Sequence, residues 1–141
     1  MEAKTAYLTM KPISWNRLAY LERWAMQPSC GAFVTFAGVV RADRHEGRTV
    51  RALFYEAYAE MAERQLAYLV AETTARWSLD AVEIQHRLGL VEAGQISVVV
   101  VVRAQHRAMA YAASQFLLEG IKQRVPIWKH THYDDGTSRS C

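Results

Sequence analysis

The order of apolar and polar residues predicts two kinds of β-strand. Residues 81–90 (AVEIQHRLGL) alternate regularly, which is typical of a strand with one buried face. Residues 96–102 (ISVVVVV) are continuously apolar, which predicts a strand that is buried on both faces. In the alternating strand the inward positions are Val82, Ile84, His86 and Leu88, and the outward positions are Glu83, Gln85 and Arg87.

A second pair of apolar segments surrounds a polar loop. Residues 31–41 (GAFVTFAGVVR) are apolar on both faces, which predicts a buried strand with Gly38 as a bulge or a site of close approach. Residues 42–48 form the loop, and residues 49–58 return as the second strand of a hairpin-like pair. A turn at 91–94 (VEAG) leads into the valine-rich strand.

Three segments have apolar residues at the spacing of an amphipathic helix. The first follows Ser14, a residue type that often caps a helix N-terminus, and it ends before Pro28. The apolar stripes are Trp15, Leu18, Leu21 and Ala25 in the first helix, Met61, Leu66, Leu69, Val70 and Thr73 in residues 59–77, and Met109, Ala113, Phe116 and Gly120 in residues 106–124.

Two short strands, at residues 6–10 and 127–133, complete the expected elements. Strands that pair in hairpins, with helices between them, favour an α+β fold over a parallel, doubly wound sheet. The chain has no internal repeat, low-complexity tract or linker, so we expect residues 1–141 to form one domain.

The composition is typical of a globular cytoplasmic domain. Apolar residues make up 51% and charged residues 22%, and a net charge of +3 is too small to indicate a nucleic-acid-binding protein. Two cysteines, Cys30 and Cys141, do not suggest a disulfide framework, which favours a reducing cytosol. The apolar run at 96–102 is far shorter than the roughly 20 residues of a membrane-spanning helix, and the N-terminus lacks the apolar core of a secretory signal.

Several common catalytic and binding motifs are absent from the sequence. It has neither the glycine-rich loops of nucleotide-binding proteins nor the serine elbow of hydrolases. His130, His132 and Cys141 lie near the C-terminus, but their spacing matches no zinc motif with a second ligand pair. We therefore expect no metal site.

Cationic residues stand where predicted strands end and a helix begins. The valine-rich strand ends at Arg103, and His106 and Arg107 fall at the start of the next helix. Free backbone N–H groups, an imidazole and a guanidinium at a helix N-terminus together form an anion pocket. Arg41 similarly ends the strand at 31–41. The alternative for each of these residues is an ordinary solvated side chain.

Residues 119–130 (EGIKQRVPIWKH) contain three cations among apolar residues. Lys122 and Arg124 suit the end of a helix, where cations complement the helix dipole. Lys129 lies beyond Pro126, so that explanation does not extend to it. A lysine in apolar surroundings can act as an acid, a base or a nucleophile, or it can simply extend its ammonium group into water.

Four segments occur in an order and at a spacing typical of one family: GAFVTFAGVVR (31–41), LFYEAYAEMAERQL (53–66), HRLGLVEAGQISVVVVVRAQHRAMAYAASQF (86–116) and IKQRVPIWK (121–129). Together they resemble the large, catalytic subunit of molybdopterin synthase, from about Gly31 to Lys129. The resemblance implies a hammerhead-like, two-layer α+β domain with a mostly antiparallel sheet and about three helices.

The same resemblance implies an enzyme of molybdenum cofactor biosynthesis. The family's enzyme installs the dithiolene of molybdopterin on cyclic pyranopterin monophosphate. Its sulfur comes from a small ubiquitin-like partner whose C-terminal Gly-Gly ends in a thiocarboxylate. The resemblance implies no metal or organic cofactor for this step, and it implies a homodimer within a heterotetramer.

The family's substrate-contacting positions fall on Val39, Val40 and Arg41, on His106 and Arg107, on Lys122, and on Lys129, His130 and Thr131. The lysine that matches Lys122 is regarded as catalytic, and it either polarises the thiocarboxylate or moves a proton. Lys129 is expected to support charge on the intermediate. Many members have a lysine at the position of Val39 and an acidic residue at that of Thr131, so contacts through these two side chains differ in this chain.

The spacing of the site residues predicts how the protein assembles. His106 and Lys122 lie 16 positions apart on one predicted helix. At the rise of an α-helix this separation is about 24 Å, which a small pterin does not bridge. If the helix is continuous, a two-fold dimer can still join the two ends, because it brings the start of one helix near the end of its mate.

Two other functions are compatible with the sequence. A non-catalytic, partner-binding paralogue would keep the fold without turnover, and the substitutions at Val39 and Thr131 are its only support. A small basic nucleic-acid-binding domain is the third hypothesis. Against it, the cations cluster near buried segments and do not interleave with exposed aromatic residues.

Overall fold

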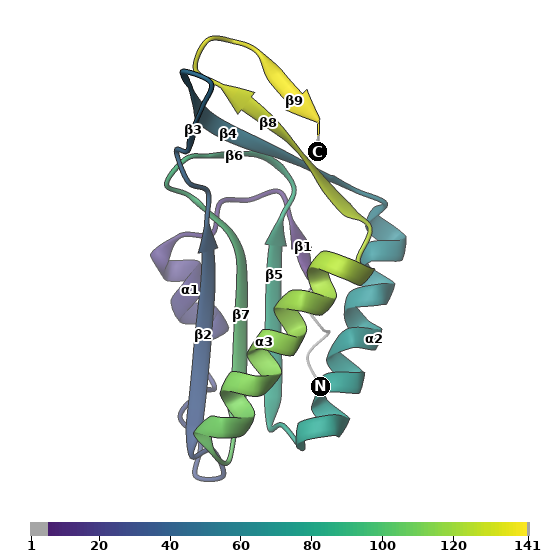
Figure 1. Ribbon diagram of the computed structural model, residues 1–141. Coiled ribbons are helices and arrows are strands. Elements are labelled where there is room, and N and C mark those ends of the chain that lie inside the picture. Colours follow the sequence, from purple (N-terminus) through teal and green to yellow (C-terminus); the bar gives the residue numbers. More distant parts are fainter. Residues whose placement is uncertain (1–5, 141) are drawn as a thin grey trace.

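The computed structural model describes residues 6–140, which form two β-sheets and three helices (Figure 1). No helix in this part of the chain is both long and apolar enough to cross a membrane. The elements in chain order are β1 (Leu8–Thr9), α1 (Trp15–Leu21), β2 (Ala32–Val39), β3 (Arg44–His45), β4 (Arg48–Ala57), α2 (Ala59–Trp77), β5 (Ala81–Arg87), β6 (Gly89–Glu92), β7 (Ile96–Ala104), α3 (Arg107–Arg124), β8 (Ile127–Tyr133) and β9 (Ser138–Ser140).

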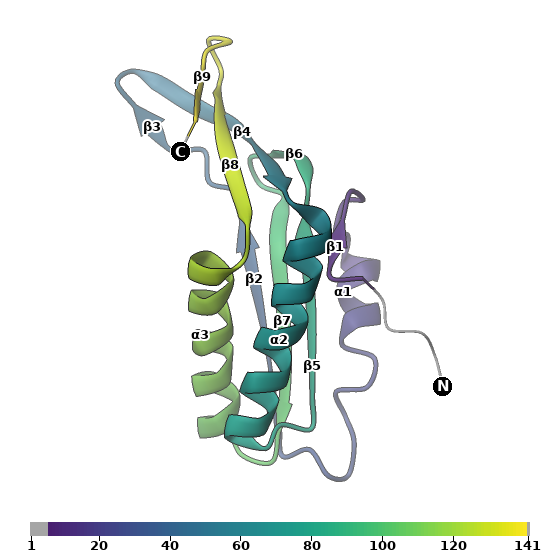
Figure 2. The same ribbon diagram turned by 90° about the vertical axis from the view of Figure 1, so that its right-hand side faces the viewer.

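The first sheet has the strand order β1-β5-β7-β2 and lies between helices (Figure 2). Helices α2 and α3 cover one face, where they pack with Val100 and Val102 of β7. On the other face Val99 and Val101 pack with residues of α1 and of the segment before it. These four valines are at most 2% exposed, so the predicted burial of this strand on both faces is confirmed.

The second sheet stands at one end of the first and gives the molecule its hammerhead outline (Figure 1). Its strand order is β3-β4-β8-β9, and β6 also pairs with β4. All of its pairings are antiparallel, and the β1–β5 pairing in the first sheet is parallel. Because β8 follows α3 directly, this sheet carries Lys129 close to the C-terminal end of α3. The predicted α+β class, with mostly antiparallel strands and three helices, is confirmed among the described residues.

The predicted hairpin between residues 31–41 and 49–58 is wrong. β2 pairs with β7 along its whole length, and β4 pairs with β6 and β8 in the other sheet. The intervening loop, residues 42–48, crosses between the sheets and contains the short strand β3. Local alternation indicates that a segment is a strand, but the partner is selected by which faces are buried together.

The predicted burial of β2 on both faces is also wrong. β2 is an edge strand of the first sheet, so no further strand covers its outer side. Phe33, Phe36 and Val39 are consequently 42%, 39% and 50% exposed. The bulge predicted at Gly38 is confirmed, because the register with β7 shifts between Gly38 and Val39.

The alternating strand β5 is more buried than the sequence predicts. Gln85 and Arg87 were expected to face outward, but they are 2% and 4% exposed. The N-terminal segment and α1 cover this face, and Gln85 donates to the Ala6 carbonyl and accepts from Arg17. His86 lies inward, as predicted.

The remaining differences concern the ends of elements and one helix face. α1 ends at Leu21, several residues before the predicted end near Pro28, and β6 occupies the first half of the predicted turn at 91–94. In α2, Met61 is exposed and the neighbouring Ala62 takes the buried position. The segment after β8 contains a further short strand, β9, which was not predicted.

Gly31 lies immediately before β2, against the backbone of Gln105. A Cβ added at Gly31 would be 1.9 Å from the Gln105 carbonyl oxygen, and this oxygen belongs to the main chain, which has little room to move. We expect Gly31→Ala to lower the free energy of unfolding by about 2 kcal/mol or more, because the backbone must shift in a packed region. Denaturant titration followed by circular dichroism measures this loss.

Gly94→Ala is the matched control for this prediction. Gly94 has a φ of +90°, and nothing lies within 4 Å of an added Cβ, so the substitution strains the backbone without a clash. Its cost should be about 1 kcal/mol. Equal losses in the two variants would contradict the proposed clash at Gly31.

Candidate functional site

A pocket of about 460 Å³ lies where the C-terminal end of α3 meets β8 and the first sheet. We call it the lysine pocket, because Lys122 of α3 and Lys129 of β8 both line it. The two lysines that were separate features of the sequence therefore share one site. The lining residues are Tyr55, His86, Val98, Leu118, Ile121, Lys122, Ile127, Trp128 and Lys129.

Local structure explains how both lysines reach this pocket. α3 ends at Arg124, and Val125, in an extended conformation, leads through Pro126 directly into β8. Lys122 thus stays on the last turn of the helix, beside Ile121. Lys129 is paired with Tyr55 across β4 and β8, and directly opposed residues project from the same face of a sheet.

The lysine pocket is rich in positive charge and poor in compensating carboxylates. Within residues 6–140, neither Lys122 nor Lys129 has an ion-pair partner. Arg124, by contrast, forms an ion pair with Glu72 at 2.7 Å, so it is a surface residue. Two unpaired ammonium groups among apolar side chains favour an anionic ligand, because apolar walls strengthen electrostatic contacts.

Two further residues of the pocket, Tyr55 and His86, were not identified as site residues from the sequence. Burial raises the pKa of Tyr55 and lowers the pKa of His86, so both are neutral near pH 7. Their rings meet edge to face, with centroids 5.0 Å apart. The inward position of His86 in an alternating strand is the only sequence signal, and it does not indicate proximity to Lys122.

His106 and Arg107 lie at the opposite end of α3 (Figure 1). They line a separate pocket of about 470 Å³ with residues at the start of β2. His106 is the N-cap residue, and its side chain makes no capping hydrogen bond. α3 is continuous over its 18 residues, so this anion-binding candidate and the lysine pocket are at two ends of one rigid helix.

The predicted positions at the end of β2 do not line the lysine pocket. Val40 is buried, and its N–H donates to the Gln95 carbonyl. Arg41 is exposed and lies 3.2 Å from Asp43. Val39 lines a third pocket, on the α1 side of the sheet.

His130 and Thr131 follow Lys129 on β8 but have different surroundings. One ring nitrogen of His130 lies 2.7 Å from a carboxylate oxygen of Glu56, and the other lies 2.9 Å from the Ser140 hydroxyl. Hydrogen bonds from His130 and Trp128 hold the pKa of Glu56 below its usual value. Because strand residues alternate, His130 projects from the face opposite Lys129, and Thr131 is buried.

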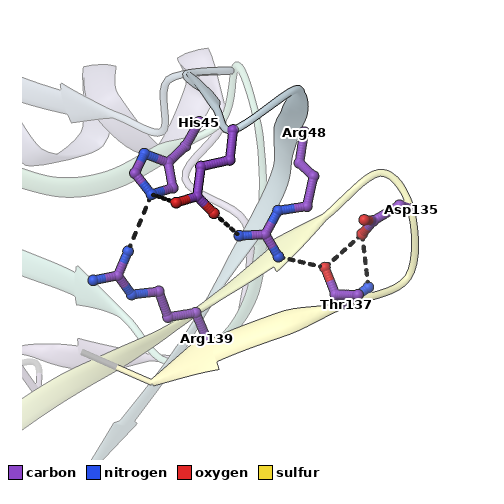
Figure 3. Close-up of polar contacts among 6 residues, drawn as sticks. His45, Arg48, Asp135, Thr137 and Arg139 are labelled. Carbon is purple, nitrogen blue, oxygen red and sulfur yellow. Dashed lines mark hydrogen bonds and ion pairs between the residues drawn. The ribbon is translucent and has the colours of Figure 1, made fainter.

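A polar network joins the β3–β4 turn to the β8–β9 hairpin (Figure 3). Arg48 donates to the Thr137 hydroxyl at 2.9 Å and forms an ion pair with Glu46 at 3.7 Å. A guanidinium nitrogen of Arg139 lies 3.4 Å from His45. These contacts hold the C-terminal segment against the loop at residues 42–48.

No group of three or more histidine, cysteine, aspartate or glutamate side chains in residues 6–140 is arranged to hold a metal ion. Of the residues considered as ligands, His130 and His132 lie on β8, and Cys141 lies outside the described part of the chain. The polar groups that line the lysine pocket include two ammonium donors, a phenol and an imidazole.

Comparison with known proteins extends this picture. Residues 8–124 match the family model described as MoaE protein. The molybdopterin synthase catalytic subunit of Thermoplasma volcanium is 44% identical over 110 residues, which cover 78% of this chain and 80% of that protein. The crystal structure of molybdopterin synthase from Staphylococcus aureus has a TM-score of 0.85 at 33% identity, and the match covers 98% of this chain and 97% of that one.

A more distant structure has the same fold. It is described as the complex of subunits 1 and 2 of the molybdopterin-converting factor from Helicobacter pylori. The TM-score is 0.76 at 22% identity, over 95% of this chain and 88% of that one. From the family match and the identity to a catalytic subunit over most of both sequences, we conclude that this chain belongs to the MoaE protein family of molybdopterin synthase catalytic subunits.

Proposed function

We propose that this enzyme transfers sulfur to cyclic pyranopterin monophosphate and so forms the dithiolene of molybdopterin. The donor is the thiocarboxylate at the C-terminal Gly-Gly of a small ubiquitin-like subunit, and the reaction takes place in the cytoplasm. Membership of the catalytic-subunit family supports the reaction class. The two-subunit complex of the Helicobacter pylori converting factor supports a small partner.

The observation that carries the proposal is the lysine pocket. Lys122 and Lys129 come from different elements and line one largely apolar cavity. A thiocarboxylate is anionic. When water then attacks the acyl carbon of the intermediate that follows, negative charge develops on the acyl oxygen. Ammonium groups that are already in place stabilise such charge without reorganisation. A Gly-Gly tail suits a pocket lined by bulky side chains, because glycine lets a backbone pass close to the walls.

The proposed roles follow the charges of the site residues. Lys122 acts at the acyl carbon, either by polarising the thiocarboxylate or by moving a proton, and Lys129 stabilises charge on the intermediate. Arg41, His106 and Arg107 bind the phosphate and the pterin. Val39, Val40, His130 and Thr131 complete the substrate-binding set. No metal or organic cofactor takes part in the step.

We further propose that two chains share each site. The unbroken α3 keeps His106 and Lys122 of one chain about 24 Å apart, so a single chain does not offer both to one pterin. The free edge of β2, which packs against α3 and carries the half-exposed Phe33 and Phe36, supports a two-fold interface on this side of the molecule. There the two α3 helices would run antiparallel, and a small subunit on each chain gives a heterotetramer.

A product assay tests this function. The purified protein is incubated with thiocarboxylated small subunit and cyclic pyranopterin monophosphate, and both products are analysed by mass spectrometry. We expect a pterin that has gained two sulfur atoms and a small subunit that ends in an ordinary carboxylate. Each donor loses its C–S bond and gains a C–O bond to water, so ¹⁸O-labelled water should label this carboxylate.

The assay also separates the alternatives. A small subunit that binds the protein but keeps its thiocarboxylate would indicate a non-catalytic, partner-binding paralogue. Steep, salt-dependent binding to arbitrary oligonucleotides, without turnover, would instead indicate a nucleic-acid-binding domain.

A further inference from the structure

His86 occupies the lysine pocket with a fixed tautomer. Its Nδ1 lies 2.7 Å from the main-chain carbonyl oxygen of Arg87. A carbonyl oxygen only accepts hydrogen bonds, so Nδ1 must carry the proton. In the neutral ring Nε2 is then a bare acceptor, and burial lowers the pKa of His86, which favours this neutral form.

The Nε2 atom is open to the pocket. Within residues 6–140 no group forms a hydrogen bond with this atom, and the atom is not fully buried. It therefore keeps accessible surface, although His86 as a whole is only 7% exposed. The edge-to-face contact with Tyr55 and the Nδ1 hydrogen bond fix the plane of the ring.

The other polar side chains of the pocket do not offer a comparable acceptor. The ammonium groups of Lys122 on α3 and Lys129 on β8 only donate. Burial raises the pKa of Tyr55 on β4, so its hydroxyl stays protonated and is a donor as well as an acceptor, and the indole N–H of Trp128 donates to Glu56 outside the pocket. These side chains thus suit ligand oxygens, and among the lining side chains His86 is the one that accepts from a ligand N–H group without also presenting a donor.

An extended peptide brings both kinds of group into a pocket. Its carbonyl and terminal oxygens suit the lysines, but each residue also carries an N–H that loses its water on entry. A buried donor without a partner weakens binding. We infer that Nε2 of His86 accepts a hydrogen bond from a main-chain N–H of the Gly-Gly tail, an inference that rests on the proposed function because the tail must enter this pocket.

The test is a double-mutant cycle between the protein and the tail. Small subunits are prepared by chemical ligation with the natural Gly-Gly, or with either glycine replaced by N-methylglycine, which lacks the N–H. Each is titrated by calorimetry against the full-length wild type and against His86→Phe and His86→Gln. Phenylalanine keeps the ring without an acceptor, and glutamine supplies an amide oxygen.

We expect N-methylation at one of the two glycines to weaken binding to the wild type about three- to tenfold, the usual effect of one hydrogen bond. His86→Phe should lose a similar factor with the natural tail and should be little affected by N-methylation at that glycine. His86→Gln should recover part of the affinity and part of the sensitivity. The added methyl group acts on all variants alike, so the difference between variants isolates the hydrogen bond.

Several outcomes would overturn the inference. One is an equal loss on N-methylation in the wild type and in His86→Phe, at both glycines. Another is unchanged wild-type affinity for both N-methylated tails, which decides the question even if His86→Phe does not fold. Deletion of both glycines without any loss of affinity has a different meaning, because it contradicts entry of the tail into the pocket and therefore the proposed function.

Discussion

Lys122→Ala should abolish dithiolene formation while the protein stays folded and still binds its small subunit. Lys122 is exposed, so its removal leaves no cavity in the core. It does remove one of the two unpaired cations that line the lysine pocket. Loss of a single preorganised donor at a developing charge costs about a hundred- to a thousandfold in rate. Single-turnover assays with thiocarboxylated small subunit measure the rate, and calorimetry measures binding.

Two further variants sharpen this prediction. Lys122→Arg keeps the positive charge but is not readily deprotonated and has a different shape, so it should also fail. Arg124→Ala is the matched control, because Arg124 lies two positions away on the same helix end and pairs with Glu72 on the surface. An active Lys122→Arg enzyme would show that only the positive charge of Lys122 is needed. Near-normal turnover by Lys122→Ala would refute its catalytic role.

Activity should return when two inactive variants are mixed, if each site is shared between two chains. In a mixed dimer of Lys122→Ala and Arg107→Ala, one site loses both residues and the other keeps both. Random exchange makes about half of the dimers mixed, so about a quarter of the wild-type sites should be intact. The measurement is turnover before and after subunit exchange, with exchange followed by native mass spectrometry.

A second pair of variants serves as the control. Lys122 and Lys129 line the same pocket in one chain, so mixing Lys122→Ala with Lys129→Ala leaves every site without one of the two lysines. This pair should stay inactive after exchange. Activity from both pairs, or from neither pair once exchange is demonstrated, would contradict the shared site.

Much of the secondary structure follows from the sequence, because helix and strand periodicity is a local property. The predicted helix at residues 59–77 has the bounds of α2, and the helix predicted at 106–124 differs from α3 by one residue. The valine-rich strand is central and buried on both faces, as its composition indicates. The central position of this strand could be predicted without knowing which strands pair with it, because a continuously apolar strand must have both of its faces covered.

The family and the reaction class were also predicted from the sequence, because four motifs keep their order and spacing along the chain. Residue-level roles are different, since most of the predicted site residues lie apart within one chain. Lys122 and Lys129 share a pocket, but His106 and Arg107 lie at the far end of α3 and Arg41 lies at the end of β2.

Only the tertiary structure decided which strands pair and which side chains meet. β2 pairs with β7 and β4 with β8, against the expected hairpin, because burial of whole faces selects strand partners. The same packing covers Gln85 and Arg87, which alternation assigned to solvent. It also places His86 beside two lysines that are more than 30 positions away in the sequence. A one-dimensional pattern records the period of a segment but not its neighbours in space, and the neighbours form the site.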